Sequence, residues 1–222
     1  RPRALAGPLA VARVAAWDLR HGSLLGDIAV PFARAGAGVV IGAALGAAIG
    51  GGIGLRPRLR QRVEPALDFL RAIPPLLIFS LLLSMLGYGE AARVTVAGFV
   101  AALAVSLHVA PALGDVHVER LRTLRALGAS RLQLLRFLYA YELLPAAITG
   151  LRHAFSAALI VTVVAEMLVG APYGLGTRAV SAQIAYDAPR LYAVTLIAGL
   201  LGHAVARSTL RLERHIRELL AP

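Results

Sequence analysis

Long runs of mostly apolar residues divide this chain into segments of about the thickness of a membrane. The five runs are residues 35–55, 72–89, 94–114, 143–169 and 188–206. The first and third extend for 21 positions without a charged residue and the second for 18, whereas the fourth contains Arg152 and Glu166. A transmembrane helix needs about 20 mostly apolar residues to cross about 30 Å of hydrocarbon. The pattern therefore predicts an all-α fold, a polytopic membrane helix bundle with five visible spans.

The composition agrees with a membrane protein. Of the 222 residues, 58% are apolar and 16% are charged, which is too few charged residues for a water-soluble surface. The formal net charge is +11, but only 6% of the residues are aromatic and the apolar runs leave no room for a soluble basic face, so no nucleic acid is expected as a partner. The absence of Cys excludes disulfides, thiolate chemistry and Cys-based metal sites.

Arginine placement predicts which loops face the cytoplasm, because short loops rich in positive charge remain on that side. Three clusters follow the first, third and fifth runs: Arg56, Arg58, Arg60 and Arg62; Arg120, Arg122, Arg125, Arg131 and Arg136; and Arg207, Arg211, Arg214 and Arg217. The opposite loops, 87–93 and 170–187, contain only Arg93 and Arg178. We therefore expect the C-terminus, with residues 218–222 as a short tail, in the cytoplasm.

Five spans with a cytoplasmic C-terminus would leave residue 1 outside, and the sequence does not begin with Met. This predicts a sixth span upstream of Arg1. Within the first segment, residues 1–30, apolar positions recur at helical spacing among charges, which predicts an external, interfacial amphipathic helix over about 9–28. Four Arg before position 21 argue against an external location.

Glycines recur at every fourth position of the first run. They are Gly38, Gly42, Gly46, Gly50 and Gly54. At about 3.6 residues per turn they form one smooth stripe, which would allow another helix to approach closely. The alternative is that a Gly-rich composition produced the spacing by chance. The stripe predicts helix packing and no chemistry.

A few residues are candidates for a gate or for a translocation path. Arg71, Pro74 and Pro75 begin the second run, where the missing backbone donors either kink a helix or mark the point at which it starts. Arg152 and Glu166 are about 21 Å apart along one helix and cannot pair with each other. For Glu166 we favour a hydrogen bond to a neighbouring loop near the outer surface over contact with a solute.

No metal site is expected from the histidines. Three of them, His108, His153 and His203, lie in three different runs and lack the spacing of metal ligands.

Residues 115–141 are expected to form a helical hairpin in the cytoplasm. A helix from about 118 to 127 ends at Gly128, and Ser130 with Gln133 has the spacing of a capping box that opens the next helix. The first helix has an apolar ridge flanked by Arg, formed by Leu121, Leu124 and Leu127. Such a ridge suits docking into a groove of a soluble partner, although a loop resting on lipid headgroups fits the pattern equally well.

Short motifs occur along the chain in a recognisable order and spacing. They are Leu70-Arg71-Ala72-Ile73-Pro74-Pro75, Leu86-Gly87-Tyr88-Gly89-Glu90, Leu127-Gly128-Ala129-Ser130-Arg131, Gln133-Leu134, Leu144-Pro145-Ala146, Thr149-Gly150-Leu151-Arg152, Ala165-Glu166-Met167-Leu168 and Gly174-Leu175-Gly176. Over about residues 8–217 the sequence resembles the membrane subunits of type I ATP-binding-cassette (ABC) importers. The resemblance is to the branch that serves taurine, aliphatic sulfonates, nitrate and related small molecules.

Two departures from the family pattern affect the hairpin. The family usually has Glu-Ala-Ala six residues before the glycine, where this chain has Arg122-Thr123-Leu124. The first Leu-Pro of the family is here Ala140-Tyr141, and only the second, Leu144-Pro145, remains. The contact with an ATPase is therefore expected to differ in detail, and pairing with a related chain in a heterodimer stands beside a homodimer as an alternative. The branch normally has six spans, which agrees with a first helix upstream of Arg1.

The resemblance implies a permease subunit of an ATP-driven, binding-protein-dependent importer for a small polar or anionic solute in the bacterial inner membrane. The importer domain would extend over residues 31–217, and the implied partners are two ABC ATPases, a second permease subunit and an external solute-binding protein. The implied ATPase contacts are Arg122, Thr123, Leu124, Leu127, Gly128, Ala129, Ser130 and Arg131. The chain has no Lys and therefore no Gly-x4-Gly-Lys-Ser/Thr phosphate loop, so ATP and Mg are expected on the ATPase. The chain itself is expected to be no enzyme and to hold no cofactor.

Two other classes of membrane protein would need features that the sequence lacks. A secondary transporter or channel subunit would need inverted repeats or acidic residues near the centres of the spans, and the sequence has neither feature. An intramembrane enzyme would need catalytic side chains that converge at one depth, which the scattered histidines do not supply.

Overall fold

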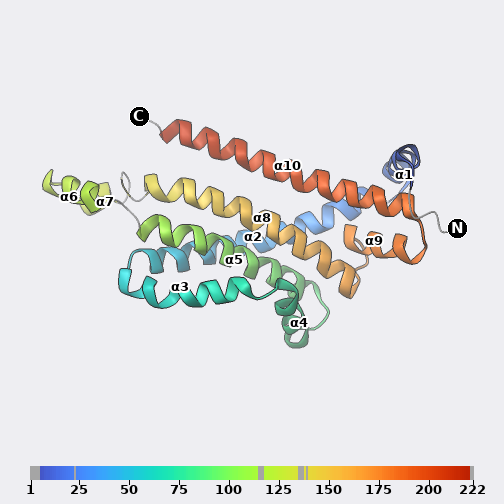
Figure 1. Ribbon diagram of the computed structural model, residues 1–222, viewed down its shortest axis with the longest axis horizontal. Helices are drawn as coiled ribbons and strands as arrows, with labels where there is room; N and C mark the ends of the chain where they lie inside the picture. Colours follow the sequence, from blue (N-terminus) through green and yellow to red (C-terminus); the bar gives the residue numbers. More distant parts are fainter. Residues whose placement is uncertain (1–5, 23, 115–117, 135–137, 139, 221–222) are drawn as a thin grey trace.

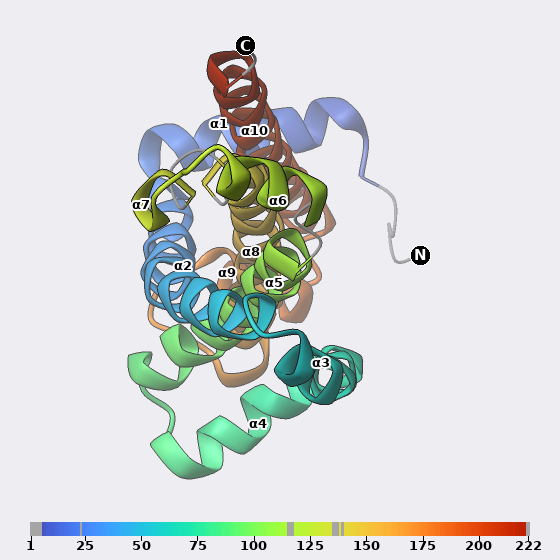
Figure 2. The ribbon, with the colours of Figure 1, turned by 90° about the vertical axis from the view of Figure 1, so that its left-hand side faces the viewer.

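The computed structural model describes residues 6–22, 24–114, 118–134, 138 and 140–220, and the regular structure within these ranges is helical. The helices are α1 (Pro8–His21), α2 (Leu24–Gly54), α3 (Pro57–Ala72), α4 (Pro75–Leu86), α5 (Glu90–Gly114), α6 (Val118–Ala126), α7 (Arg131–Leu134), α8 (Ala140–Val169), α9 (Leu175–Ile184) and α10 (Ala188–Leu220). The long helices α2, α5, α8 and α10 run side by side along the long axis of the molecule (Figures 1 and 2). The predicted all-α bundle is thus confirmed.

Four of the helices are long and apolar enough to cross a membrane, namely α2, α5, α8 from Leu143 and α10, and the α3–α4 pair makes a fifth if the two helices are one broken span. The main core joins three of the four. It is formed by Ala35 and Val39 of α2, Ala97, Ala101, Val105, Val109 and Leu113 of α5, and Ala154, Ala158 and Leu159 of α8. Most of these side chains are small, so the three helices approach one another closely.

The glycine stripe of α2 lies against α5 of the same chain. All five glycines are buried. A Cβ on Gly38 would lie 2.6 Å from the Cβ of Ala97, and one on Gly42 would lie 2.9 Å from the Cβ of Ala101. A Cβ on Gly46 would meet the backbone of Ala102, with the Cα only 3.0 Å away. In the structure the stripe therefore packs α2 against α5 within the subunit.

The second predicted span, 72–89, is wrong in extent. α4 has only 12 residues, from Pro75 to Leu86, and α3 meets it at an angle of 88°. The break has a local cause, because two successive prolines lack backbone N–H donors and Pro75 suits the first turn of a new helix. Gly87 ends α4 with a φ of 75°. The prolines could have kinked a helix or marked its start. In the structure they mark the start of α4, and the polar helix α3 ends just before them.

Two other boundaries differ from the prediction. The amphipathic helix expected over 9–28 ends at His21, and residues 24–34 belong to α2, which continues through Asp27 and Arg34 into the apolar run. At the other end of the chain, α10 extends unbroken for 33 residues, well beyond the predicted end at 206. In both cases the helix includes charged residues, which the count of uncharged residues had placed outside the span.

Candidate functional site

The hairpin of α6 and α7 projects beyond one end of the bundle (Figure 1). Gly128, in the turn, has a φ of 80°, in the left-handed region that favours glycine. The N–H of Ala129 donates to the carbonyl of Leu124 and the N–H of Gly128 to that of Arg125, both at 3.0 Å. These two bonds form a Schellman motif, which ends α6. The predicted helix and its left-handed end are confirmed.

A capping box opens α7, as the spacing of Ser130 and Gln133 predicts. The N–H of Ser130 donates to Oε1 of Gln133 at 2.7 Å, and the N–H of Gln133 donates to Oγ of Ser130 at 3.3 Å. The two caps together determine the path of the chain between α6 and α7. The angle between the helices is therefore encoded locally, independently of packing against the bundle.

The hairpin presents apolar side chains beside charged ones. Leu127 is 78% exposed and Leu132 is also exposed, whereas Leu121 and Leu124 are partly buried. Arg122, Thr123, Gly128 and Ser130 are exposed as well, and Ala129 is partly buried. The side chain of Arg131 and all of Arg136 lie outside the described part of the structure. We call this end of the bundle the hairpin end.

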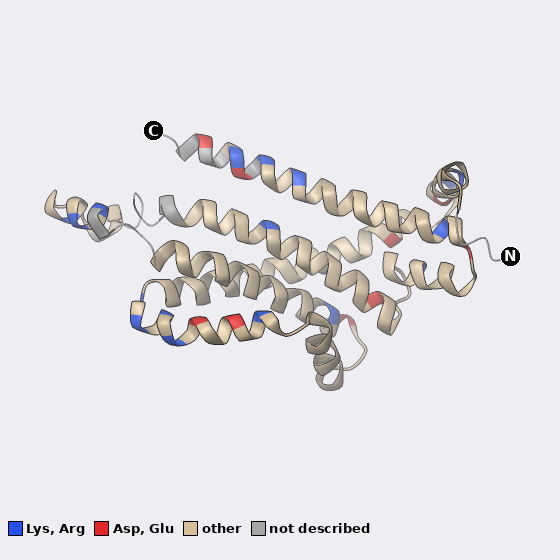
Figure 3. Ribbon diagram, in the orientation of Figure 1, with Lys and Arg blue, Asp and Glu red and all other residues tan. Residues whose placement is uncertain are grey.

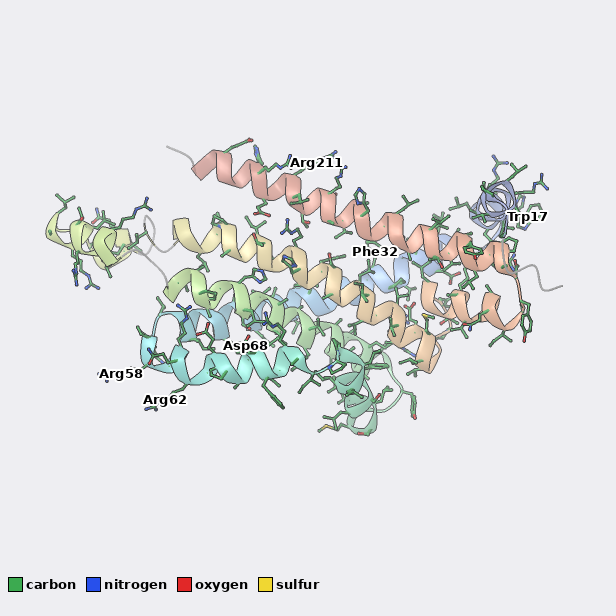
Figure 4. The ribbon with its side chains drawn as sticks, in the orientation of Figure 1. Trp17, Phe32, Arg58, Arg62, Asp68 and Arg211 are labelled. Atoms are coloured by element: carbon green, nitrogen blue, oxygen red, sulfur yellow. The ribbon has the colours of Figure 1, made fainter. Side chains whose placement is uncertain are left out.

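Basic residues gather at the hairpin end on α3 and α10 as well (Figure 3). Arg58 and Arg62 extend outward from the start of α3, and Arg211 is on the last turns of α10 (Figure 4). The predicted Arg clusters of 56–62 and 207–217 thus lie largely on helices and not in loops.

The opposite end of the bundle holds the gate candidate Glu166. Its carboxylate is fully buried and accepts hydrogen bonds from the N–H of Gly176 at 3.0 Å and from Nη1 of Arg34 at 2.6 Å. Gly176 is in the first turn of α9, the short helix that connects α8 to α10 (Figure 1). Asp27 of α2 accepts from the N–H of Gly174, just before this helix, at 3.1 Å. Two carboxylates from other helices therefore cap the start of α9.

A second set of ion pairs holds the same end together. Arg178 of α9 pairs with Asp27 and, at 2.9 Å, with Asp18 of α1. Arg190 of α10 also pairs with Asp18, at 3.1 Å. Burial lowers the pKa of Arg178, but the bonds to Asp18 and Asp27 outweigh this and raise it above its usual value. The guanidinium thus stays charged, and α1, α2, α9 and α10 are tied together. We call this the charged end.

The structure does not bring the remaining gate candidates together with Glu166. Arg71 is an exposed residue on the last turn of α3, near the helix break at Pro74 and Pro75. Arg152 pairs with Glu213 of α10 at 3.5 Å, and Glu213 also accepts a hydrogen bond from Thr149 at 3.1 Å.

Sequence reasoning missed several contacts of the predicted and neighbouring residues. The rings of His108 and His153 stack at 5.0 Å, although these residues lie in different runs. Arg34, Glu90 and Asp27 were also missed, because each lies at or beyond the end of an apolar run. A signal was present for Arg34, because a charge that directly precedes a span needs a partner.

Solved structures with the same fold are membrane subunits of transporters. The methionine ABC transporter MetNI, in inward-facing conformations, gives a TM-score of 0.71 at 20% identity over 87% of this chain and 95% of that one. An amino acid ABC transporter crystallised with histidines gives 0.67 at 14% identity over 96% of this chain and 99% of that one. The fold is therefore that of a type I ABC importer transmembrane domain.

Sequence comparison identifies the family. Residues 23–218 match the binding-protein-dependent transport system inner membrane component family. A probable ABC transporter permease protein of Brucella melitensis is 32% identical over 200 residues, 89% of this chain and 80% of that protein. The taurine transport system permease protein TauC of Escherichia coli is 29% identical over 178 residues, 80% of this chain and 62% of that protein.

The chain belongs to this family, and it is a multi-pass inner-membrane permease subunit of a binding-protein-dependent ABC importer. The resemblance seen in the sequence motifs is thus confirmed. Nothing in these findings supports the alternative of a secondary transporter or channel subunit.

Proposed function

We propose that this chain lines the translocation path of its importer and that the α6–α7 hairpin is the contact through which a separate ATPase drives transport. The observation that carries this proposal is the hairpin itself. It extends beyond the bundle, it exposes Leu127, and its shape is held by the Schellman motif at Gly128 and the capping box at Ser130. A preformed, exposed turn suits docking into a partner, because little conformational entropy is lost on binding.

The proposed assembly has two ABC ATPases, which bind ATP and Mg, a second permease subunit and an external binding protein. The second subunit is an identical or a related chain. The hairpin end and the C-terminus face the cytoplasm, since arginines of α3, α6 and the last turns of α10 gather at this end. The solute is small and polar or anionic, which agrees with the taurine permease among the relatives.

Among the gate and path candidates, the contacts support different roles. Glu166 serves to hold α9 in place, because its carboxylate is fully buried and both of its bonds are to protein groups. The break between α3 and α4 at Pro74 and Pro75 supports a gate, since the two helices can change their angle there without losing a helical hydrogen bond from either proline, which has no N–H. Arg71, on the last turn before this break, is the candidate for lining the opening.

Purification from native membranes tests this function. An affinity-tagged chain should co-purify with an ATPase in roughly equal amounts, and vesicles with the complex and its binding protein should hydrolyse ATP faster when solute is present. Transport activity by the chain without any ATPase would contradict the proposal.

The absence of Cys allows a direct test of orientation. A single Cys in place of Tyr186, which is exposed at the charged end, should react with a membrane-impermeant maleimide in intact spheroplasts. A single Cys in place of Leu127 should react only after permeabilisation. The reverse pattern would show that the hairpin faces outward.

A further inference from the structure

At the charged end, two buried arginines lie beneath a carboxylate that faces solvent. The side chains of Arg34 on α2 and Arg93 on α5 are 9% and 6% exposed, whereas the side chain of Glu90, which pairs with both, is 57% exposed. Glu90 is the first residue of α5. The carboxylate therefore covers a pair of guanidinium groups that would otherwise be open to this end of the bundle.

The contacts with Glu90 have the geometry of an oxyanion site. Nε and Nη2 of Arg34 each donate to one oxygen of Glu90 at 2.6 Å, and Nη1 of Arg93 donates to it at 2.9 Å. A guanidinium fork of this kind binds two oxygens of any carboxylate or similar oxyanion side by side. Nε of Arg93 is buried and has no hydrogen-bond partner among the described residues. The site thus offers a donor that Glu90 does not use.

The charges around this site balance only when an anion occupies it. Arg34 also pairs with the fully buried Glu166, and Nη2 of Arg93 donates to the carbonyl of Gly170. Without Glu90, two guanidinium groups would face the single carboxylate of Glu166, which leaves one positive charge uncompensated. A poorly solvated charge without a partner is costly, so a monovalent anion is favoured there.

We propose that Arg34 and Arg93 form a binding site for a monovalent oxyanion, the carboxylate or sulfonate group of a small solute, and that Glu90 fills this site in the absence of solute. Glu90 can leave, because its side chain already contacts solvent and α5 begins directly after Gly89. Its return releases the solute by competition for the same donors. The proposal rests on the proposed function, since it takes the charged end as the entrance of the translocation path.

Emptying the site by substitution tests the proposal with a simple probe. The full chain, purified from membranes together with any subunits that accompany it, is heated with increasing sodium methanesulfonate at constant ionic strength. For Glu90→Ala, the melting temperature should rise saturably, by about 3–6 °C at ten times the dissociation constant, because the anion replaces the lost carboxylate. The melting temperature of the wild type should change little, because Glu90, which is tethered beside the site, competes with the added anion. Dimethyl sulfone, a neutral molecule of similar shape, should have no effect.

Asp68→Ala is the matched control. Asp68 is also a half-exposed carboxylate paired with an arginine at 3.3 Å, but its partner Arg71 is itself 67% exposed. An equal response of Asp68→Ala and Glu90→Ala, or no response of Glu90→Ala, overturns the proposal. If Glu90→Ala does not fold, Glu90→Gln takes its place, because it keeps the size of the side chain but not the charge. Its melting temperature must show the same rise with the anion. The absence of this rise also overturns the proposal. The measurement needs no ATP. Its outcome therefore does not depend on whether an ATPase co-purifies with the chain.

Discussion

Replacing Gly128 with Val should abolish transport without loss of the protein from the membrane. A residue with a Cβ in the left-handed conformation costs roughly 1–2 kcal/mol, and a β-branched residue is especially disfavoured there. At a φ of 80° the Schellman motif would not form with Val, so α6 would be presented at a different angle. The hairpin extends beyond the bundle, and therefore the spans should insert and pack as before.

Reconstituted vesicles with the ATPase and binding protein provide the measurement for Gly128→Val. Solute-stimulated ATP hydrolysis and uptake are measured side by side, and membrane content is measured by immunoblot. Ala126→Val is the control, because it adds the same side chain to an exposed helical position two residues earlier. Full coupled uptake by Gly128→Val would mean that the hairpin is not the coupling contact.

Replacing Gly46 with Leu should prevent the subunit from folding into a stable bundle. A Cβ on Gly46 would meet backbone atoms of Ala102, which cannot rotate away, so α2 and α5 would have to separate along their length. Overpacking of this kind costs about 1–3 kcal/mol where neighbours can adjust, and more where only backbone faces the new atoms. We expect a clear fall in the melting temperature and in the monodisperse fraction on size-exclusion chromatography.

Ala47→Leu provides the comparison for Gly46→Leu. Ala47 is the next residue of α2 and is exposed, so its larger side chain would point away from α5. This variant should behave like the wild type in detergent. Equal behaviour of the two variants would show that the bundle does not depend on a close approach of α2 and α5 at Gly46.

The bundle could be predicted from the sequence because its signals are local. The 21-residue uncharged runs lie within α2 and α5, the glycine spacing predicts a close helix contact, and Gly128 with Ser130 specifies the hairpin turn. The identity of the helix that faces the stripe could not be predicted. That helix is α5, whose small residues Gly98, Ala102, Ser106 and Ala110 recur at the same period and lie against the glycines, but a matching period alone does not say which helices pack together.

The charged end could not be predicted, because its residues interact over long distances in the sequence. Arg34 and Glu166 are 132 positions apart, and Asp27 and Arg178 are 151 positions apart. Counting uncharged residues treats each such charge as the end of a span, whereas a paired charge can be part of one. The same counting extended the second span over 72–89, because prolines interrupt a helix without adding charge; the break itself was indicated by Pro74 and Pro75.

The length of α10 has a consequence for the surrounding lipid. Its uncharged stretch between Arg190 and Arg207 has 16 residues, or about 24 Å at 1.5 Å per residue, against about 30 Å of hydrocarbon. Arg190 is held by Asp18 and cannot follow the membrane surface, so the hydrophobic mismatch of about 6 Å falls on the other end of this stretch. There the exposed side chain of Arg207 can extend along the helix and reach the phosphates, and the adjacent lipids can thin to meet it.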